Sequence, residues 1–169
     1  MRGLFLAIAS IVLAGCASGR STSDIPAVRG FELPKYLGRW YEIARLPQWF
    51  ERDMDHVTAE YCADGDAVKV VNSGIRNGER REAVGRAVFA GDASEGELRV
   101  SFFRPFYGDY RIIMLDPDYR AAMVTSSTRD SLWILSRTPA LPPEKLSEYL
   151  KQAELWGFDT AKLEYGKQE

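Results

Sequence analysis

The chain has 169 residues, a length that indicates one globular domain. Its formal net charge at pH 7 is only −2, so the overall charge does not favour binding to a strongly charged partner. The nearest approach to a basic cluster is Arg80-Arg81, and Glu79 and Glu82 flank it, so a nucleic-acid partner is not expected.

The first fifteen residues have the character of a secretory leader. Arg2 gives a short positive start, and the apolar run that follows, residues 4–13, is too short to span a bilayer as a permanent helix. Leu13-Ala14-Gly15-Cys16 is similar to the bacterial lipobox, which implies cleavage before Cys16 and acylation of that cysteine. An ordinary secretory signal with an incidental cysteine is the alternative.

Residues 16–34 are then expected to form a lipidated N-terminus and a tether. Ala17 stands where retention in the inner membrane would be expected to show Asp, so the resemblance implies sorting to the outer membrane. The small, polar residues 18–24 are typical of a flexible linker. With lipid on Cys16, Cys62 has no intramolecular partner for a disulfide.

From Gly38 onward, aromatic and branched residues recur in short segments between turn signals, after a loop-like run over residues 30–37. Asn77-Gly78 is a strong hairpin signal between two of these segments. The connections are short, which favours an antiparallel meander that closes into a barrel and so removes its exposed edges. Eight strands are predicted: 40–46, 57–62, 68 to the turn at 77–78, 82–90, 98–102, 110–115, 119–125 and 132–136.

The period changes to that of a helix after Pro142-Pro143. Apolar residues recur at helical spacing up to Ala153, and Gly157 is placed as a C-terminal cap with Phe158 folding back on the last turn. The polar face mixes charges, so the helix is expected to pack outside the barrel. Residues 162–165 are expected to add one short strand.

An eight-stranded barrel either fills its interior with side chains or holds one small ligand. Small residues mixed with large apolar ones favour a greasy cavity, and Ala83, Gly85 and Ala87 fall on one face of a single strand. A filled core, with the small residues facing the helix, stays open as the alternative. The predicted cavity residues are Tyr61, Phe89, Phe102, Tyr110, Met114 and Trp133.

Three segments resemble the signatures of the lipocalin family, in the outer-membrane lipoprotein group related to apolipoprotein D. They are Gly38-Arg39-Trp40-Tyr41-Glu42-Ile43-Ala44-Arg45, then Leu115-Asp116 with Tyr119, and Leu132-Trp133-Ile134-Leu135-Ser136-Arg137-Thr138-Pro139; the run from Val100 to Gly108 is similar to a segment of the bacterial group. The resemblance implies an all-β fold over residues 35–169, an eight-stranded antiparallel up-and-down barrel with a C-terminal helix outside.

The resemblance also implies roles for single residues. Gly38, Trp40 and Arg137 form the structural signature, with the Arg137 guanidinium across the Trp40 ring at the closed end. The loop at residues 48–55 would border the open end.

The sequence contains little that supports catalysis. His56 is the single histidine in the sequence. It would have to be the one histidine ligand of any transition-metal site, or the base of any catalytic triad with Ser126 or Ser127. Neither a metal nor a cofactor is expected. Glu42 and Glu60 are candidates for a carboxylate pair. Two readings are open for Cys62: a reactive thiol, or, as is commoner, a buried and inert cysteine.

The leading hypothesis is a membrane-anchored carrier on the periplasmic side of the outer membrane, a monomer or homodimer. It would bind, store or transport fatty acids or lysophospholipids, whose headgroups could meet Arg45, Arg52 or Arg104. The alternatives are a lipid-acting enzyme on the same fold, and a structural envelope lipoprotein whose Trp49-Phe50 loop docks a partner or the membrane.

Overall fold

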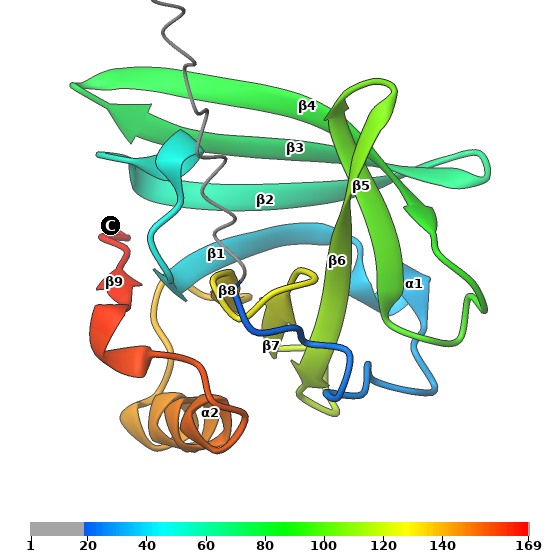
Figure 1. The fold of residues 1–169 in the computed structure, drawn as a ribbon. Coiled ribbons are helices and arrows are strands. Elements are labelled where there is room, and N and C mark those ends of the chain that lie inside the picture. Colours follow the sequence, from blue (N-terminus) through cyan, green and yellow to red (C-terminus); the bar gives the residue numbers. More distant parts are fainter. Residues whose placement is uncertain (1–18, 169) are drawn as a thin grey trace, which may run out of the picture.

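Eight antiparallel strands follow one another around a closed barrel in the computed structural model, which describes residues 19–168 (Figure 1). Each strand pairs with the next, and β1 pairs with both β8 and β2, which closes the ring. The predicted up-and-down barrel is therefore confirmed. The strands are β1 (Gly38–Arg45), β2 (Asp55–Asp64), β3 (Ala67–Arg76), β4 (Glu79–Phe89), β5 (Glu97–Phe103), β6 (Phe106–Leu115), β7 (Ala121–Thr125) and β8 (Leu132–Ser136).

Successive connections alternate between the two ends of the barrel because each strand reverses the direction of the last. The open end carries the loop with the 3₁₀ helix η1 (Trp49–Glu51), the turn at Asn77-Gly78, the β5–β6 turn and the β7–β8 loop. The opposite end is closed by α1 (Leu33–Tyr36). The sequence predicted a loop over residues 30–37, and this one-turn helix is a correction; Pro34 in its first turn is compatible with helix.

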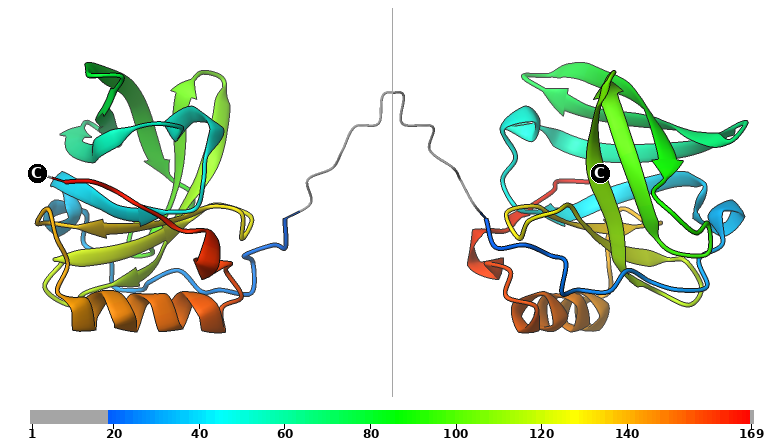
Figure 2. Two further views of the ribbon diagram at one scale, coloured as in Figure 1. Left: turned by 90° about the vertical axis from the view of Figure 1, so that its left-hand side faces the viewer. Right: turned by 45° about the vertical axis from the view of Figure 1, so that its right-hand side comes forward.

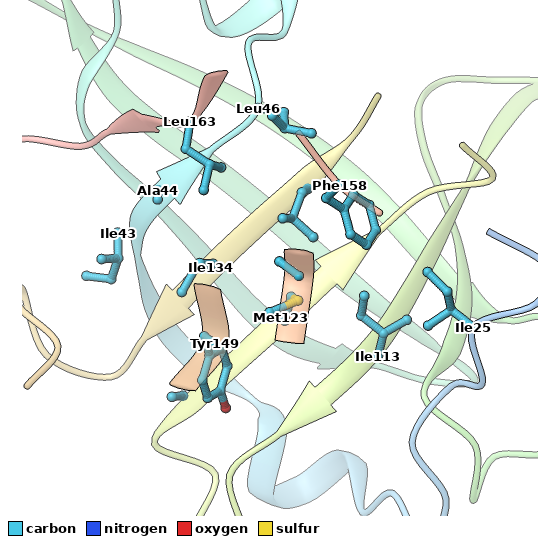
Figure 3. Close-up of a cluster of buried hydrophobic side chains, with 13 residues drawn as sticks. Ile25, Ile43, Ala44, Leu46, Ile113, Met123, Ile134, Tyr149, Phe158 and Leu163 are labelled. Atoms are coloured by element: carbon cyan, nitrogen blue, oxygen red, sulfur yellow. The ribbon is translucent and has the colours of Figure 1, made fainter. Parts of the chain in front are cut away.

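Helix α2 (Pro143–Leu155) lies across the outside of the barrel, as predicted (Figure 2). Tyr149 and Ala153 from the helix are buried against Met123 and Ile134 from β7 and β8 (Figure 3). Gly157 has φ +81°, and Phe158 donates its N–H to the Ala153 carbonyl, which is the predicted glycine cap. The chain ends with η2 (Thr160–Lys162) and β9 (Glu164–Tyr165), which pairs with β1.

Register shifts interrupt four of the strand pairings, and two of these β-bulges determine which residues face the interior at the site. One shifts the pairing of β1 with β8 between Glu42 and Ala44, and the other shifts β6 against β7 between Ile112 and Met114. An extra residue in one strand reverses the alternation beyond it, so apolar patterns alone assign later residues to the wrong face.

The N-terminal segment is bound to the barrel rather than free, which corrects the predicted flexible linker. Thr22 and Ile25 are buried, and Thr22 donates its backbone N–H to the Ser127 carbonyl. Cys16 and the boundary between residues 15 and 16 lie outside the described residues. Within residues 19–168, no helix is both long enough and apolar enough to cross a membrane.

Candidate functional site

The barrel encloses a cavity of about 410 Å³ that reaches the open end. This volume lies within the range of small-molecule sites. Most of the wall is apolar, and the aliphatic part comes from alternate positions of the strands, where side chains of one face point inward. These aliphatic lining residues are Val57, Ala59, Val70, Val100, Val124 and Leu135.

Three tyrosines join in a hydrogen-bonded chain between the cavity and the closed end. The Tyr110 hydroxyl lies 2.7 Å from that of Tyr36 and 2.8 Å from that of Tyr61. Burial raises the pKa of Tyr61 to about 12 and raises that of Tyr110 well above its usual value, so these phenols stay neutral. Because the hydroxyls satisfy one another, the rings can present apolar surface to the cavity.

Below these tyrosines the closed end is packed solid. The Arg137 guanidinium carbon lies 3.9 Å from the centroid of the Trp40 ring, as the resemblance implied. Arg137 also donates hydrogen bonds to the backbone carbonyls of Lys35 and Arg39, and Gly38 has φ +93° beside it. These residues therefore fix the closed end and do not line the cavity.

Four of the six predicted cavity residues line the cavity: Tyr61, Phe102, Tyr110 and Trp133. Gly85 leaves room for the Phe102 ring, since a Cβ built there would come within 2.8 Å of it. Two further predictions are corrected by the structure, because Phe89 and Met114 lie elsewhere. Phe89 points inward but packs on Phe31 toward the closed end, with ring centroids 6.3 Å apart, and Met114 is turned by the β6 bulge onto the cluster under α2.

A buried ionic cluster lies in the wall of the cavity. Arg45 donates to Glu42 Oε1 at 2.5 Å and to the Glu51 carbonyl oxygen at 2.9 Å, and it lies 3.2 Å from a Glu164 carboxylate oxygen. The indole N–H of Trp133 donates to Glu51 Oε2 at 3.1 Å. Glu42 and Glu51 both line the cavity.

Burial dominates the electrostatics of this cluster. It raises the pKa of Glu42 to about 8, the nearby Glu51 carboxylate adds to that shift, and Arg45 partly offsets it. Burial also raises the pKa of Glu51, against the opposing effects of the Trp133 hydrogen bond and of Arg45. Glu42 and Glu51 can therefore keep a proton in the cavity wall at a pH where an exposed carboxyl group would have lost it.

Sequence reasoning missed this cluster. Glu42 and Arg45 are three residues apart, a spacing that puts them on opposite faces of a regular strand, and the β1 bulge brings them together. With its guanidinium engaged by carboxylates, Arg45 is not free to receive a headgroup, which corrects that expectation. Arg52 and Arg104 are exposed at the open end.

The structure does not assemble the candidate catalytic groups. The Glu60 side chain is about half exposed and pairs with Arg39, so it is not a partner of Glu42. Ser126 lines the cavity, whereas His56 lines a separate outer pocket. Cys62 is exposed rather than buried, because it alternates with the inward-facing Tyr61. Within residues 19–168, no group of three or more His, Cys, Asp or Glu residues is placed to hold a metal ion.

Comparisons with known proteins agree with this architecture. A family model described as a lipocalin-like domain matches residues 31–168. The chain is 41% identical to outer membrane lipoprotein Blc of Vibrio cholerae, with all of both chains covered. It is 34% identical to apolipoprotein D of Rattus norvegicus, over 75% of this chain and 70% of the relative.

A solved structure of similar fold is insecticyanin from the tobacco hornworm Manduca sexta. Its TM-score is 0.75 at 24% identity, and the match covers 89% of this chain and 88% of that one. This likeness supports the barrel and its C-terminal helix.

Proposed function

Because this chain belongs to the lipocalin family, we propose that its cavity binds the acyl chain of a fatty acid or lysophospholipid. The observation that carries the proposal is the mostly apolar cavity of about 410 Å³, open at one end and closed by tyrosines at the other. A site of this shape suits a ligand with one apolar tail and one polar end.

Affinity would come from removing the tail from water. Each buried CH₂ contributes about 0.8 kcal/mol, so twelve of them contribute roughly 10 kcal/mol before the costs of association. A micromolar Kd needs about 8 kcal/mol after those costs are subtracted, so it requires a tail longer than twelve CH₂ groups or further contacts from the headgroup. Affinity is therefore expected to rise steeply with chain length until the cavity is full.

The ionic cluster favours entry of the tail before the head. Glu42 and Glu51 place carboxyl groups in the wall, and Arg45 already forms ion pairs with both of them. An anionic headgroup at that depth would find no free cation. At the mouth, by contrast, Arg52 and Arg104 are exposed and accessible to a carboxylate or phosphate.

The site of action proposed for this chain is the periplasmic face of the outer membrane, with Cys16 as the lipid anchor. The support is the lipobox-like sequence together with 41% identity over the full chain to a relative named as an outer membrane lipoprotein.

The experiment is displacement of a fluorescent fatty acid from the wild type and two bulky variants. Ala59 lines the cavity, so Ala59→Phe is expected to fill part of it and weaken binding at least tenfold, about 1.4 kcal/mol. Val84→Phe is the matched control, because Val84 is exposed on the outer face of β4. Unchanged binding by Ala59→Phe would contradict the proposed site.

A further inference from the structure

Large aromatic side chains stand in water around the mouth of the cavity. Trp49 is 82% exposed, Phe103 81% and Phe106 77%, and Phe50 is also exposed. They come from two separate connections, the η1 loop and the β5–β6 turn, and three of the four (Phe50, Phe103 and Phe106) also line the mouth. We call these four residues the aromatic rim. Exposed apolar side chains grouped in this way mark an interaction surface.

The N-terminal segment begins beside this same end of the barrel (Figure 1). Thr22 donates its hydroxyl to the Ser126 carbonyl at 2.6 Å, and Ser21 forms a β-bridge with Thr128. Arg129 holds the segment from the β7–β8 loop through its ion pair with Asp24. Gln48 in turn donates to the Asp130 carbonyl, which joins the β7–β8 loop to the loop that carries Trp49.

The remaining tether is short. Five residue steps separate Cys16 from Ser21, and a fully extended chain covers at most about 3.6 Å per residue, so the tether reaches no more than roughly 18 Å. A lipid on Cys16 would therefore hold the β7–β8 loop, and with it the mouth, close to the membrane surface.

We propose that the open end of the barrel docks on the bilayer that holds the Cys16 lipid, with the aromatic rim in the interface, so that a lipid tail passes between bilayer and cavity without crossing water. This orientation depends on the lipid anchor of the proposed function. Tryptophan is enriched at membrane–water interfaces, and phenylalanine accompanies it on apolar surfaces that insert at the headgroup boundary.

A phospholipid surface is the occupant that these observations favour over a protein partner. The tether carries a lipid to this end of the molecule, and no such argument places a protein there. The loops also carry both signs of charge, with Arg52 beside Asp53 and Arg104 near Asp109. Docking is therefore expected to depend on the aromatic rings, and to change little with salt or with the fraction of anionic lipid.

A thiol-reactive fluorophore can be attached at either end of the barrel, which gives a matched pair of labelled proteins. Cys62 is exposed near the β2–β3 turn, at the end of the barrel opposite the mouth, and it is the one other cysteine in the sequence besides Cys16. The mouth is labelled in a Cys62→Ser, Arg52→Cys variant, since Arg52 is exposed next to η1. Each full-length lipidated protein is placed in phosphatidylethanolamine–phosphatidylglycerol vesicles whose acyl chains carry a nitroxide quencher.

The expected result is strong quenching of the label at position 52 and none at Cys62. Replacing Trp49 and Phe103 by Ser is expected to abolish quenching at position 52 while the protein still floats with the vesicles. Equal quenching at both positions, stronger quenching at Cys62, or a chain that does not float would overturn the orientation. If the label at position 52 is not quenched by the nitroxide lipids, and is instead buried when the protein self-associates in detergent, the aromatic rim is an interface with a second copy of the chain and the proposed docking is wrong.

The orientation and the carrier function fail separately. Native mass spectrometry of the same preparations reports bound lipid independently of the quenching. Bound lipid with an unquenched label at position 52 would overturn the docking alone, and a quenched label on a ligand-free barrel would leave the docking and overturn the carrier.

Discussion

Replacing Arg45 by Met removes the cation that two buried carboxyl groups share. The Arg45 and Glu42 side chains are about 5% and 4% exposed, and Glu51 is also buried, so little water can replace the guanidinium. Breaking a buried ion pair in this way typically costs about 3–5 kcal/mol. For a domain of this size that corresponds to a fall in Tm of roughly 6–20 °C.

Thermal unfolding followed by circular dichroism at pH 9 measures the effect, because Glu42, with a pKa of about 8, is ionised at that pH. Arg39→Met on the same strand is the matched control, because the Arg39–Glu60 pair is exposed and its loss should hardly change Tm. The deficit of Arg45→Met is expected to shrink at pH 5, where the carboxyl groups accept protons, and to shrink when Glu42→Gln is added. A fall in Tm no larger than that of the control would show that Arg45 does not stabilise the buried carboxyl groups.

Three further predictions concern the same fold. The pKa of Glu42 is raised in the folded state, so the folded protein binds an extra proton and loses stability as pH rises from about 4.5 towards about 8. Glu42→Gln should reduce this pH dependence, measured as the free energy of unfolding in urea at pH 5 and 8, and an unchanged difference between the two pH values would count against the prediction. Arg137→Ala should cost about 2 kcal/mol through the lost Trp40 contact and backbone hydrogen bonds, with Arg137→Lys intermediate in the same titrations; equal stability of all three proteins would contradict this. Gly157→Ala should cost about 1–2 kcal/mol because of its positive φ, measured by thermal unfolding against Gly91→Ala, which has open space at its Cβ position.

The fold was predictable because strand alternation, turn residues and helical period agree along most of the chain. Asn77-Gly78 shows this: both residues have positive φ, and Arg76 pairs directly with Glu79. Tyr119 is an exception. It was predicted to open a strand, yet it lies in the preceding turn with φ +56°, and β7 begins at Ala121.

The candidate site was predicted only in part because alternation carries no information about bulges. Tyr61 and Tyr110 were placed correctly, since Tyr61 lies in the part of β2 that pairs regularly from Thr58 onward and Tyr110 precedes the β6 bulge. Met114 follows a bulge and was placed on the wrong face. The approach of Glu42 to Arg45 and Glu51 depends on a bulge and on a loop fold, and neither leaves a periodic signal.

The central claim is that the cavity holds an acyl chain in the cell, and the mass of the bound ligand tests it most directly. Mature lipidated protein, purified gently without a tag, is analysed by native mass spectrometry alongside Ala59→Phe. The wild-type spectrum is expected to contain a species heavier by one single-chain lipid or fatty acid, and the variant is expected to contain markedly less of it. A wild-type protein that carries no such ligand, and that gains none when incubated with fatty acid or lysophospholipid, would contradict it.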